Sequence, residues 1–205
     1  MKKMVLFLVL AALALGGFLY YRSLRTTPEY SLLQAAKATQ LHDMKEFERY
    51  IDVNSVTSHL VDQVADQGST LASLAPVSIG LEGVLRMLKP QLTQAAYTEI
   101  ERYIETGSVT AAAEANVRRP MGISLMGLIG TVVSPKSQFK GVKYTRQEGE
   151  AALVGLEFSQ PTYDTTMVLE VKMLDRGDHW QATEITNTGA ILKQVARLEK
   201  RKRGL

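Results

Sequence analysis

The spacing of apolar residues along the chain changes about two thirds of the way through. Between residues 28 and 107 apolar residues recur every three or four positions, which is the spacing of helices with one buried face. After Pro135 apolar and polar residues alternate, which is the spacing of strands with one buried face. The pattern therefore predicts a helical half followed by a sheet.

Several residues indicate where the helices begin and end. The fixed φ of Pro28 suits the entry to a first helix. Asp43, followed three residues later by Glu46, is typical of an N-cap with its capping-box partner. Pro90 either kinks a helix or opens the next one, and Gly107 is expected to end that helix.

Four alternating runs make up the predicted sheet. They are separated by turn residues at 148–149, 161–164 and 175–178, which indicates an antiparallel meander. A last apolar stretch at 191–203 has helical spacing. The fold class expected is α+β, with the helical half packed on a four-stranded antiparallel sheet, followed by a C-terminal helix.

The N-terminus carries a separate feature. Residues 4–21 form an uncharged, apolar run of 18 residues, and a helix of this length spans about 27 Å, close to the thickness of the hydrocarbon layer. We expect residues 1–24 to be an uncleaved signal-anchor that holds the chain in the bilayer through residues 4–21. A cleaved signal, suggested by the small-residue pattern at 12–14, and a buried soluble helix are the alternatives.

The residues after the N-terminal segment are expected to form one domain followed by a basic tail. Residues 27–192 are enough for a single α+β domain with its own core. Residues 22–192 carry a net charge of −4, whereas the tail, residues 193–205, carries +5. No cysteine is present, so the chain has neither disulfide framework nor thiol chemistry.

The basic tail has two interpretations. Its six cations either bind anionic lipid headgroups or remain a solvated, frayed terminus. They are Lys193, Arg197, Lys200, Arg201, Lys202 and Arg203. No aromatic residues are interleaved with them, so nucleic acid is not expected as a partner.

Residues 27–65 resemble an uncharacterised bacterial family catalogued as domain of unknown function 2939. The resemblance rests on the Thr27–Leu32 entry, the segment 34–38, His42-Asp43 and the run 47–52. It implies a bacterial protein with an N-terminal hydrophobic segment, helices and a C-terminal sheet. Residues 177–185 are also similar, more weakly, to the last strand of cystatin-like or nuclear-transport-factor-like α+β cones. Neither resemblance carries a known catalytic set.

Residues able to carry chemistry are few and scattered. The three histidines, at 42, 59 and 179, have no metal-ligand spacing, and no nucleotide or nucleophile motif is present. Asp43 and Asp52 are expected to be helix caps. Glu99, Glu101 and Glu105 are expected to form a solvated face. We therefore expect no metal, no cofactor and no enzymatic activity.

The leading hypothesis is a non-enzymatic binding or interaction domain on a bacterial cell membrane. It is expected to be single-pass, with its folded part extracytoplasmic (periplasmic), because a short basic head usually stays in the cytoplasm. The partner would be another envelope or membrane protein. A pocket between helices and sheet is expected to be lined by Tyr144, Phe158, Met167 and Trp180.

Two other functions remain open. One is a small-molecule-processing enzyme on a cystatin-like α+β scaffold. The other is an assembly subunit of a membrane complex, which would make contact through the apolar segment 121–133. That segment is too short to span a bilayer, and is either a helix covering the sheet or an exposed lid or contact surface.

Overall fold

The computed structural model describes residues 27–66, 81–113 and 137–202. Ahead of the sheet lie α2 (Pro28–Gln40), α3 (Met44–Tyr50), α4 (Val53–Asp66), α6 (Leu81–Met87), α7 (Lys89–Thr106) and α8 (Val109–Ala113). The strands are β1 (Phe139–Glu148), β2 (Ala151–Gln160), β3 (Thr165–Asp175) and β4 (Trp180–Ile185), with a short 3-10 turn, η2 (Pro161–Tyr163), between β2 and β3. The C-terminal helix is α10 (Thr188–Lys202). The predicted α+β class is confirmed.

The sheet is the predicted antiparallel meander, with strand order β1-β2-β3-β4. The helical half is also bridged directly to β4. Ile51, between α3 and α4, forms a parallel bridge with Ala182, and the amide of Asp52 donates to the Ala182 carbonyl at 2.8 Å. The chain between two helices is thereby fastened directly to the sheet.

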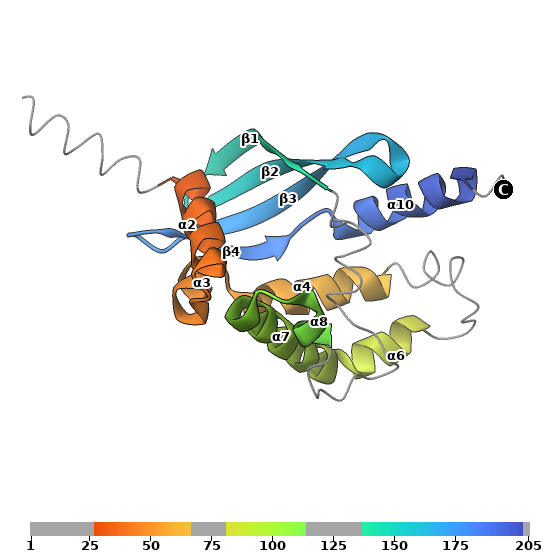
Figure 1. Cartoon of the computed structure of the whole chain (residues 1–205), viewed down its shortest axis with the longest axis horizontal. Helices are drawn as coiled ribbons and strands as arrows, with labels where there is room; N and C mark the ends of the chain where they lie inside the picture. Colours follow the sequence, from red (N-terminus) through yellow and green to blue (C-terminus); the bar gives the residue numbers. More distant parts are fainter. Residues whose placement is uncertain (1–26, 67–80, 114–136, 203–205) are drawn as a thin grey trace, which may run out of the picture.

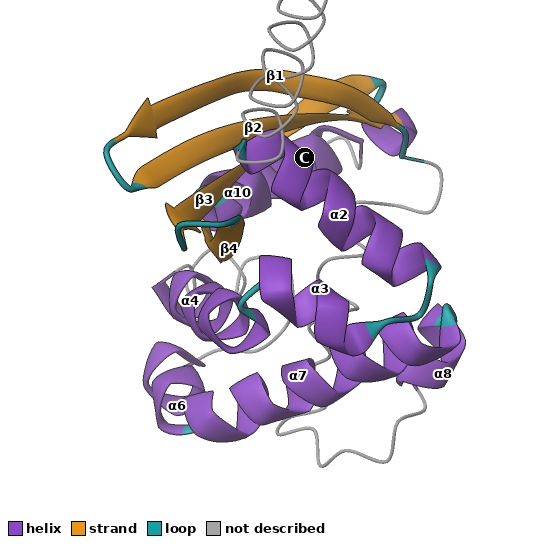
Figure 2. Cartoon of the chain, turned by 90° about the vertical axis from the view of Figure 1, so that its left-hand side faces the viewer, coloured by secondary structure: helices purple, strands orange, loops and turns teal. Residues whose placement is uncertain are grey.

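The described helices lie on one side of the sheet, as Figures 1 and 2 show. Apolar residues of alternate strand positions face them, and the core is built there. One cluster contains Ala152, Val154, Val171, Met173, Trp180 and Ala182. A second joins Met167 to α10 through Ile191 and Val195, and a third joins α4, α6, α7 and α10. We call the sheet face that packs on the helices the inner face, and the opposite one the outer face.

Local signals place the helix ends where the sequence predicts them. A carboxylate oxygen of Asp43 accepts from the amide of Glu46 at 2.9 Å, and that of Asp52 accepts from the amide of Ser55 at 2.9 Å. Pro90 lies in the first turn of α7, so it opens this helix and does not kink it. Gly107 ends α7 with a φ of 65°, a conformation that favours glycine.

His42 joins the end of α2 to the end of α7. Its Nδ1 donates to the carbonyl oxygen of Ile104 at 2.7 Å, and thereby satisfies a group in the last turn of α7. A Cβ atom at Gly107 would lie only 2.7 Å from the His42 ring. The glycine is therefore required both by its backbone conformation and by the close approach of this ring.

Two predicted segments, the membrane span at 4–21 and the apolar segment at 121–133, lie outside the described residues. Within residues 27–66, 81–113 and 137–202, no helix combines the length and the apolar character needed to cross a bilayer. The expected boundary between domain and tail at residues 192–193 falls inside α10, so the tail begins as part of a packed helix.

Candidate functional site on the outer face of the sheet

The four residues expected to line one pocket lie on different faces of the sheet. Phe158 pairs with Met167 across β2 and β3, and Met167 packs on α10 from the inner face. Trp180 is also on the inner face, where it is 2% exposed. Tyr144 is on the outer face, with its ring against Gly155.

A bulge in β1 places Tyr144 on the outer face of the sheet. Val142 pairs with Leu156, but Tyr144 pairs with the adjacent Gly155, so two steps along β1 match one step along β2. Such an extra residue reverses which side chains face the core. The prediction from alternation, that Val142 and Tyr144 share the buried face, is wrong for Tyr144.

The three inner-face residues do not share a pocket either. Met167 belongs to the cluster with Ile191 and Val195 of α10. Trp180 belongs to the cluster with Met173 and Ala152, at the other end of the sheet. Both are core side chains that hold helices against the sheet, and their burial accounts for them without a ligand.

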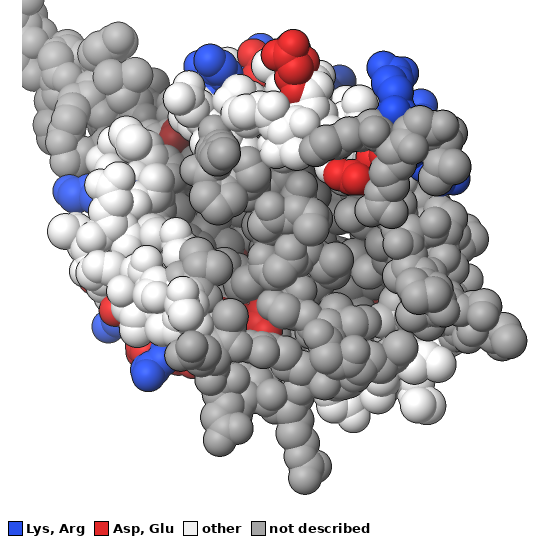
Figure 3. Space-filling view, turned by 45° about the vertical axis from the view of Figure 1, so that its right-hand side comes forward, with Lys and Arg blue, Asp and Glu red and all other residues white. Residues whose placement is uncertain are grey.

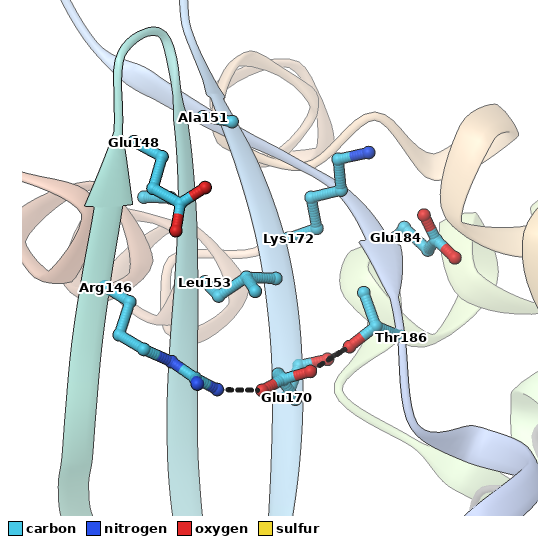
Figure 4. Close-up of a pocket in the computed structure, with 9 residues that line it drawn as sticks. Arg146, Glu148, Ala151, Leu153, Glu170, Lys172, Glu184 and Thr186 are labelled. Carbon is cyan, nitrogen blue, oxygen red and sulfur yellow. Dashed lines mark hydrogen bonds and ion pairs between the residues drawn. The ribbon is translucent and has the colours of Figure 1, made fainter.

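A groove of about 400 Å³ lies on the outer face instead. Figure 4 shows side chains that line it, which come from all four strands and from the residue after β4. Small and apolar residues of β2 lie between charged side chains of β1, β3 and β4. The lining residues are Arg146, Glu148, Ala151, Ala152, Leu153, Glu170, Lys172, Glu184 and Thr186.

Glu170 is the centre of a hydrogen-bond network in this groove. Its carboxylate accepts from the Tyr144 hydroxyl at 2.7 Å, from the Thr186 hydroxyl at 2.6 Å and from the Arg146 guanidinium at 2.9 Å. The donors come from β1 and from the residue after β4, while Glu170 lies on β3. The network thus fixes the relative positions of three parts of the sheet.

The network also sets the protonation state of its members. Hydrogen bonds from Thr186 and then Tyr144, helped by the charge of Arg146, hold the pKa of Glu170 below its ordinary value. The bond to Glu170 raises the pKa of Tyr144. At neutral pH the pair is therefore a carboxylate and a neutral phenol.

The Tyr144 ring lies directly against Gly155 of β2. A Cβ atom at Gly155 would lie 2.6 Å from the ring, so only glycine allows this approach. The Arg146 guanidinium carbon lies 4.7 Å from the ring centroid, within the range of a cation–π contact. Tyr144 thus lies beside the groove and is in contact with two residues that line it, Arg146 and Glu170.

The other end of the groove carries charges with few partners. Lys172 of β3 and Glu148 of β1 extend into it, as Figure 4 shows. Neither side chain forms an ion pair or hydrogen bond with another residue in the described part of the chain. Lys172 is opposite Glu184 in the strand register, and Glu184 has only a long contact, 3.4 Å, from Gln63.

None of the three histidines lines the groove. His42 is bonded to Ile104, His59 is exposed, and His179 is bonded to Asp178 at 2.6 Å. Over residues 27–66, 81–113 and 137–202, no group of three or more potential metal ligands is found. The expectation that Glu99 belongs to a solvated face is wrong, because this residue is 1% exposed within α7.

The basic residues of the tail lie mostly on α10. Lys193, Arg197, Lys200 and Arg201 are exposed on this helix, and Lys202 is its last residue. Arg203 lies outside the described residues.

The sequence signal for the groove was present but modest. Glu170 and Lys172 are charged residues two positions apart on a strand, which places them on one outward face. That pattern is also typical of an ordinary solvated face. The pattern does not show that Tyr144 and Arg146 lie beside Glu170, because their position depends on the bulge in β1.

Comparison with known proteins identifies no relative. No protein-family model matches the chain, nor does any curated protein or solved structure.

Proposed function

We propose that this chain is a bacterial, membrane-anchored, non-enzymatic binding domain that contacts another membrane or envelope protein through the outer face of its sheet. Residues 4–21 would span the cell membrane once, and the folded part would lie on the periplasmic side. The anchor is argued from the uncharged run of 18 residues and its basic head.

The proposed binding site is supported by the groove and by the charged side chains in it that have no partner in the described part of the chain. Its floor offers apolar contact at Leu153, and Lys172 and Glu148 offer one charge of each sign at its rim. A partner segment with charges of both signs would complement this surface. The Glu170 network keeps the strands in place, which lowers the ordering cost of binding.

The properties of Glu170 argue against the enzymatic alternative. A general acid or base is most effective when its pKa is near the working pH. Glu170 instead has a lowered pKa and already accepts three side-chain hydrogen bonds. The alternative of an assembly subunit that acts through residues 121–133 concerns a segment outside the described residues, so no described contact favours it.

Site-specific photo-crosslinking in native membranes tests the proposal. A photoreactive residue replaces Leu153 at the groove floor, and a matched probe replaces Glu105, exposed near the end of α7. We expect a discrete adduct with a membrane or envelope protein from the Leu153 position only. The captured protein, once purified, should bind the full chain in detergent.

Charge reversal then links the adduct to the groove. Lys172→Glu should reduce the yield from the Leu153 probe at least tenfold, because it places a third uncompensated carboxylate beside Glu148 and Glu184. The proposal is wrong if the Leu153 probe yields no adduct beyond that of the Glu105 control. It is also wrong if Lys172→Glu leaves the yield unchanged.

A further inference from the structure

Helix α10 carries a stripe of cations on its exposed face. Lys193, Arg197, Lys200 and Arg201 follow one another at helical spacing, so they lie along one side of the helix. All four are exposed. None forms an ion pair with a residue in the described ranges.

The acidic residue of α10 does not interrupt this stripe. Glu199 is partly buried and accepts a hydrogen bond from the Tyr163 hydroxyl at 2.6 Å. Tyr163 belongs to η2, between β2 and β3, so Glu199 is turned toward the body of the molecule. The exposed face of the helix is left with positive charge.

The opposite, apolar face of α10 is buried against the sheet and the helical half. Ile191 and Val195 pack on Met167 of the sheet, and Leu192 packs with Leu60 and Leu92 of the helical half. An amphipathic helix that inserts into a membrane needs its apolar face free. The apolar face of α10 is buried in the core, so only its charged face is available for contact.

We propose that the cationic stripe of α10 docks on anionic lipid headgroups of the membrane in which the chain is anchored. This inference rests on the anchoring part of the proposed function, but not on the groove. The contact is electrostatic and superficial, without insertion of the helix. The tether at the N-terminus favours it by raising the local concentration of headgroups.

Docking of the stripe would orient the domain on the membrane, because the start of α2 and the stripe lie far apart. The start of α2 and the end of α10 lie toward opposite ends of the longest axis, as Figure 1 shows. In the view that brings the α10 end forward, Lys and Arg side chains stand out at the upper right of the molecule (Figure 3). Anchor and stripe together would therefore lay the long axis along the membrane surface and restrict rotation about the tether.

The expected strength follows from the number of cations. Each Lys or Arg near an anionic surface strengthens binding roughly fivefold. Because the contact involves no insertion, it should require anionic lipid and weaken as salt shortens the Debye length from about 10 Å at 0.1 M.

The full chain can be tested in vesicles with a single label. It has no cysteine, so Ala190→Cys, on the exposed side of the first turn of α10, gives one labelling site. Energy transfer from a dye at this position to acceptor-labelled headgroups is measured in neutral phosphatidylcholine vesicles and in vesicles with phosphatidylglycerol. Glu105→Cys, exposed on α7, reports the background.

We expect greater transfer in the anionic vesicles, and loss of this excess in 0.5 M salt. Lys200/Arg201→Gln should weaken docking roughly 25-fold. Lys37/Lys45→Gln, which removes the same charge from exposed positions on α2 and α3, should leave it unchanged. Circular dichroism of both variants checks that the helices are intact.

The outcomes separate the stripe from the anchor. If the chain stays in carbonate-washed vesicles but energy transfer is equal in neutral and anionic lipid, the proposal that the stripe docks on headgroups is wrong. The proposal that residues 4–21 anchor the chain is then unaffected. The same holds if Lys200/Arg201→Gln has no effect beyond that of the control. Release of the chain from both kinds of vesicle contradicts the anchoring, and the proposal fails with it.

Discussion

Glu170 has an environment unlike that of an ordinary charged residue on the outer face of a sheet. It accepts hydrogen bonds from three side chains, and the exposed fraction of its side chain is only 18%. Its own amide donates to the side-chain carbonyl of Asn187 at 2.9 Å. Main chain and side chain of this residue thus hold the segment after β4 against β3.

The lowered pKa of Glu170 predicts a pH dependence of stability. A carboxyl whose folded-state pKa lies below its ordinary value of 4.5 stabilises the fold above pH 4.5, and this contribution is lost as pH falls through the folded-state pKa. Glu170→Gln should lower the free energy of unfolding by about 1–2 kcal/mol at pH 7. The difference from the native chain should shrink below pH 4.5, as measured by urea unfolding.

A control is available in the turn between β1 and β2. Glu150→Gln removes an exposed carboxylate that lines no part of the groove, and should cost less than about 0.5 kcal/mol at pH 7. A constant difference between Glu170→Gln and the native chain from pH 7 to pH 3 would contradict the argument.

At the level of elements, the bulge in β1 determines which side chains of this strand lie on the outer face. It turns Tyr144 and Arg146 toward β3, where they meet Glu170. Without it, the Tyr144 ring would face the helices. The close approach of this ring to β2 is possible because Gly155 has no side chain.

Substitution of Gly155 tests this packing. In Gly155→Ala the new methyl group would lie 2.6 Å from the Tyr144 ring, and the ring must move away from Glu170. We expect a loss of about 1–3 kcal/mol in the free energy of unfolding, typical of overpacking. Urea unfolding measures the loss.

Gly83 provides the matched substitution. It lies in α6, and nothing is within 4 Å of a Cβ atom placed there. Gly83→Ala should therefore be neutral or stabilise the chain by up to about 1 kcal/mol, because alanine favours the helix. Equal effects of the two substitutions would show that the Tyr144 contact is unimportant.

Across the whole molecule, polar contacts connect the helical half to the sheet and the helices to one another. Gln63 of α4 donates to the carbonyl of Ile185 at 2.5 Å, and the main-chain amide of Asp52 donates to the carbonyl of Ala182. The Tyr97 hydroxyl on α7 donates to Glu48 on α3 at 2.7 Å, and this bond raises the pKa of Tyr97 to about 12. Together with the shared core, these contacts indicate one cooperative unit.

The two halves should accordingly unfold together. Trp180 is the only tryptophan and reports on the sheet, while far-ultraviolet circular dichroism reports mainly on the helices. We expect the two signals to give the same midpoint in urea for the full chain in detergent. His42→Ala, which removes the bond between the ends of α2 and α7, should lower both midpoints together. Separate midpoints would instead indicate two units.

Much of the fold could be predicted from local patterns. Pro28, Asp43 and Gly107 mark helix ends because each acts on the backbone within a few residues of itself. Alternation and turn residues were enough to predict the four strands, because a hairpin is also a local structure.

The site depended on contacts between distant parts of the chain. Nothing near Lys143 in the sequence indicates that β1 adds a residue there, so the face occupied by Tyr144 emerged only once β1 had paired with β2. Likewise, Glu99 and Glu199 lie at helical spacing from buried apolar residues, but a charged residue is normally expected in solvent, so only the packing shows that Glu99 is buried and that Glu199 is turned toward Tyr163. Side-chain direction at such positions follows from strand register and helix packing, which join residues far apart in the chain.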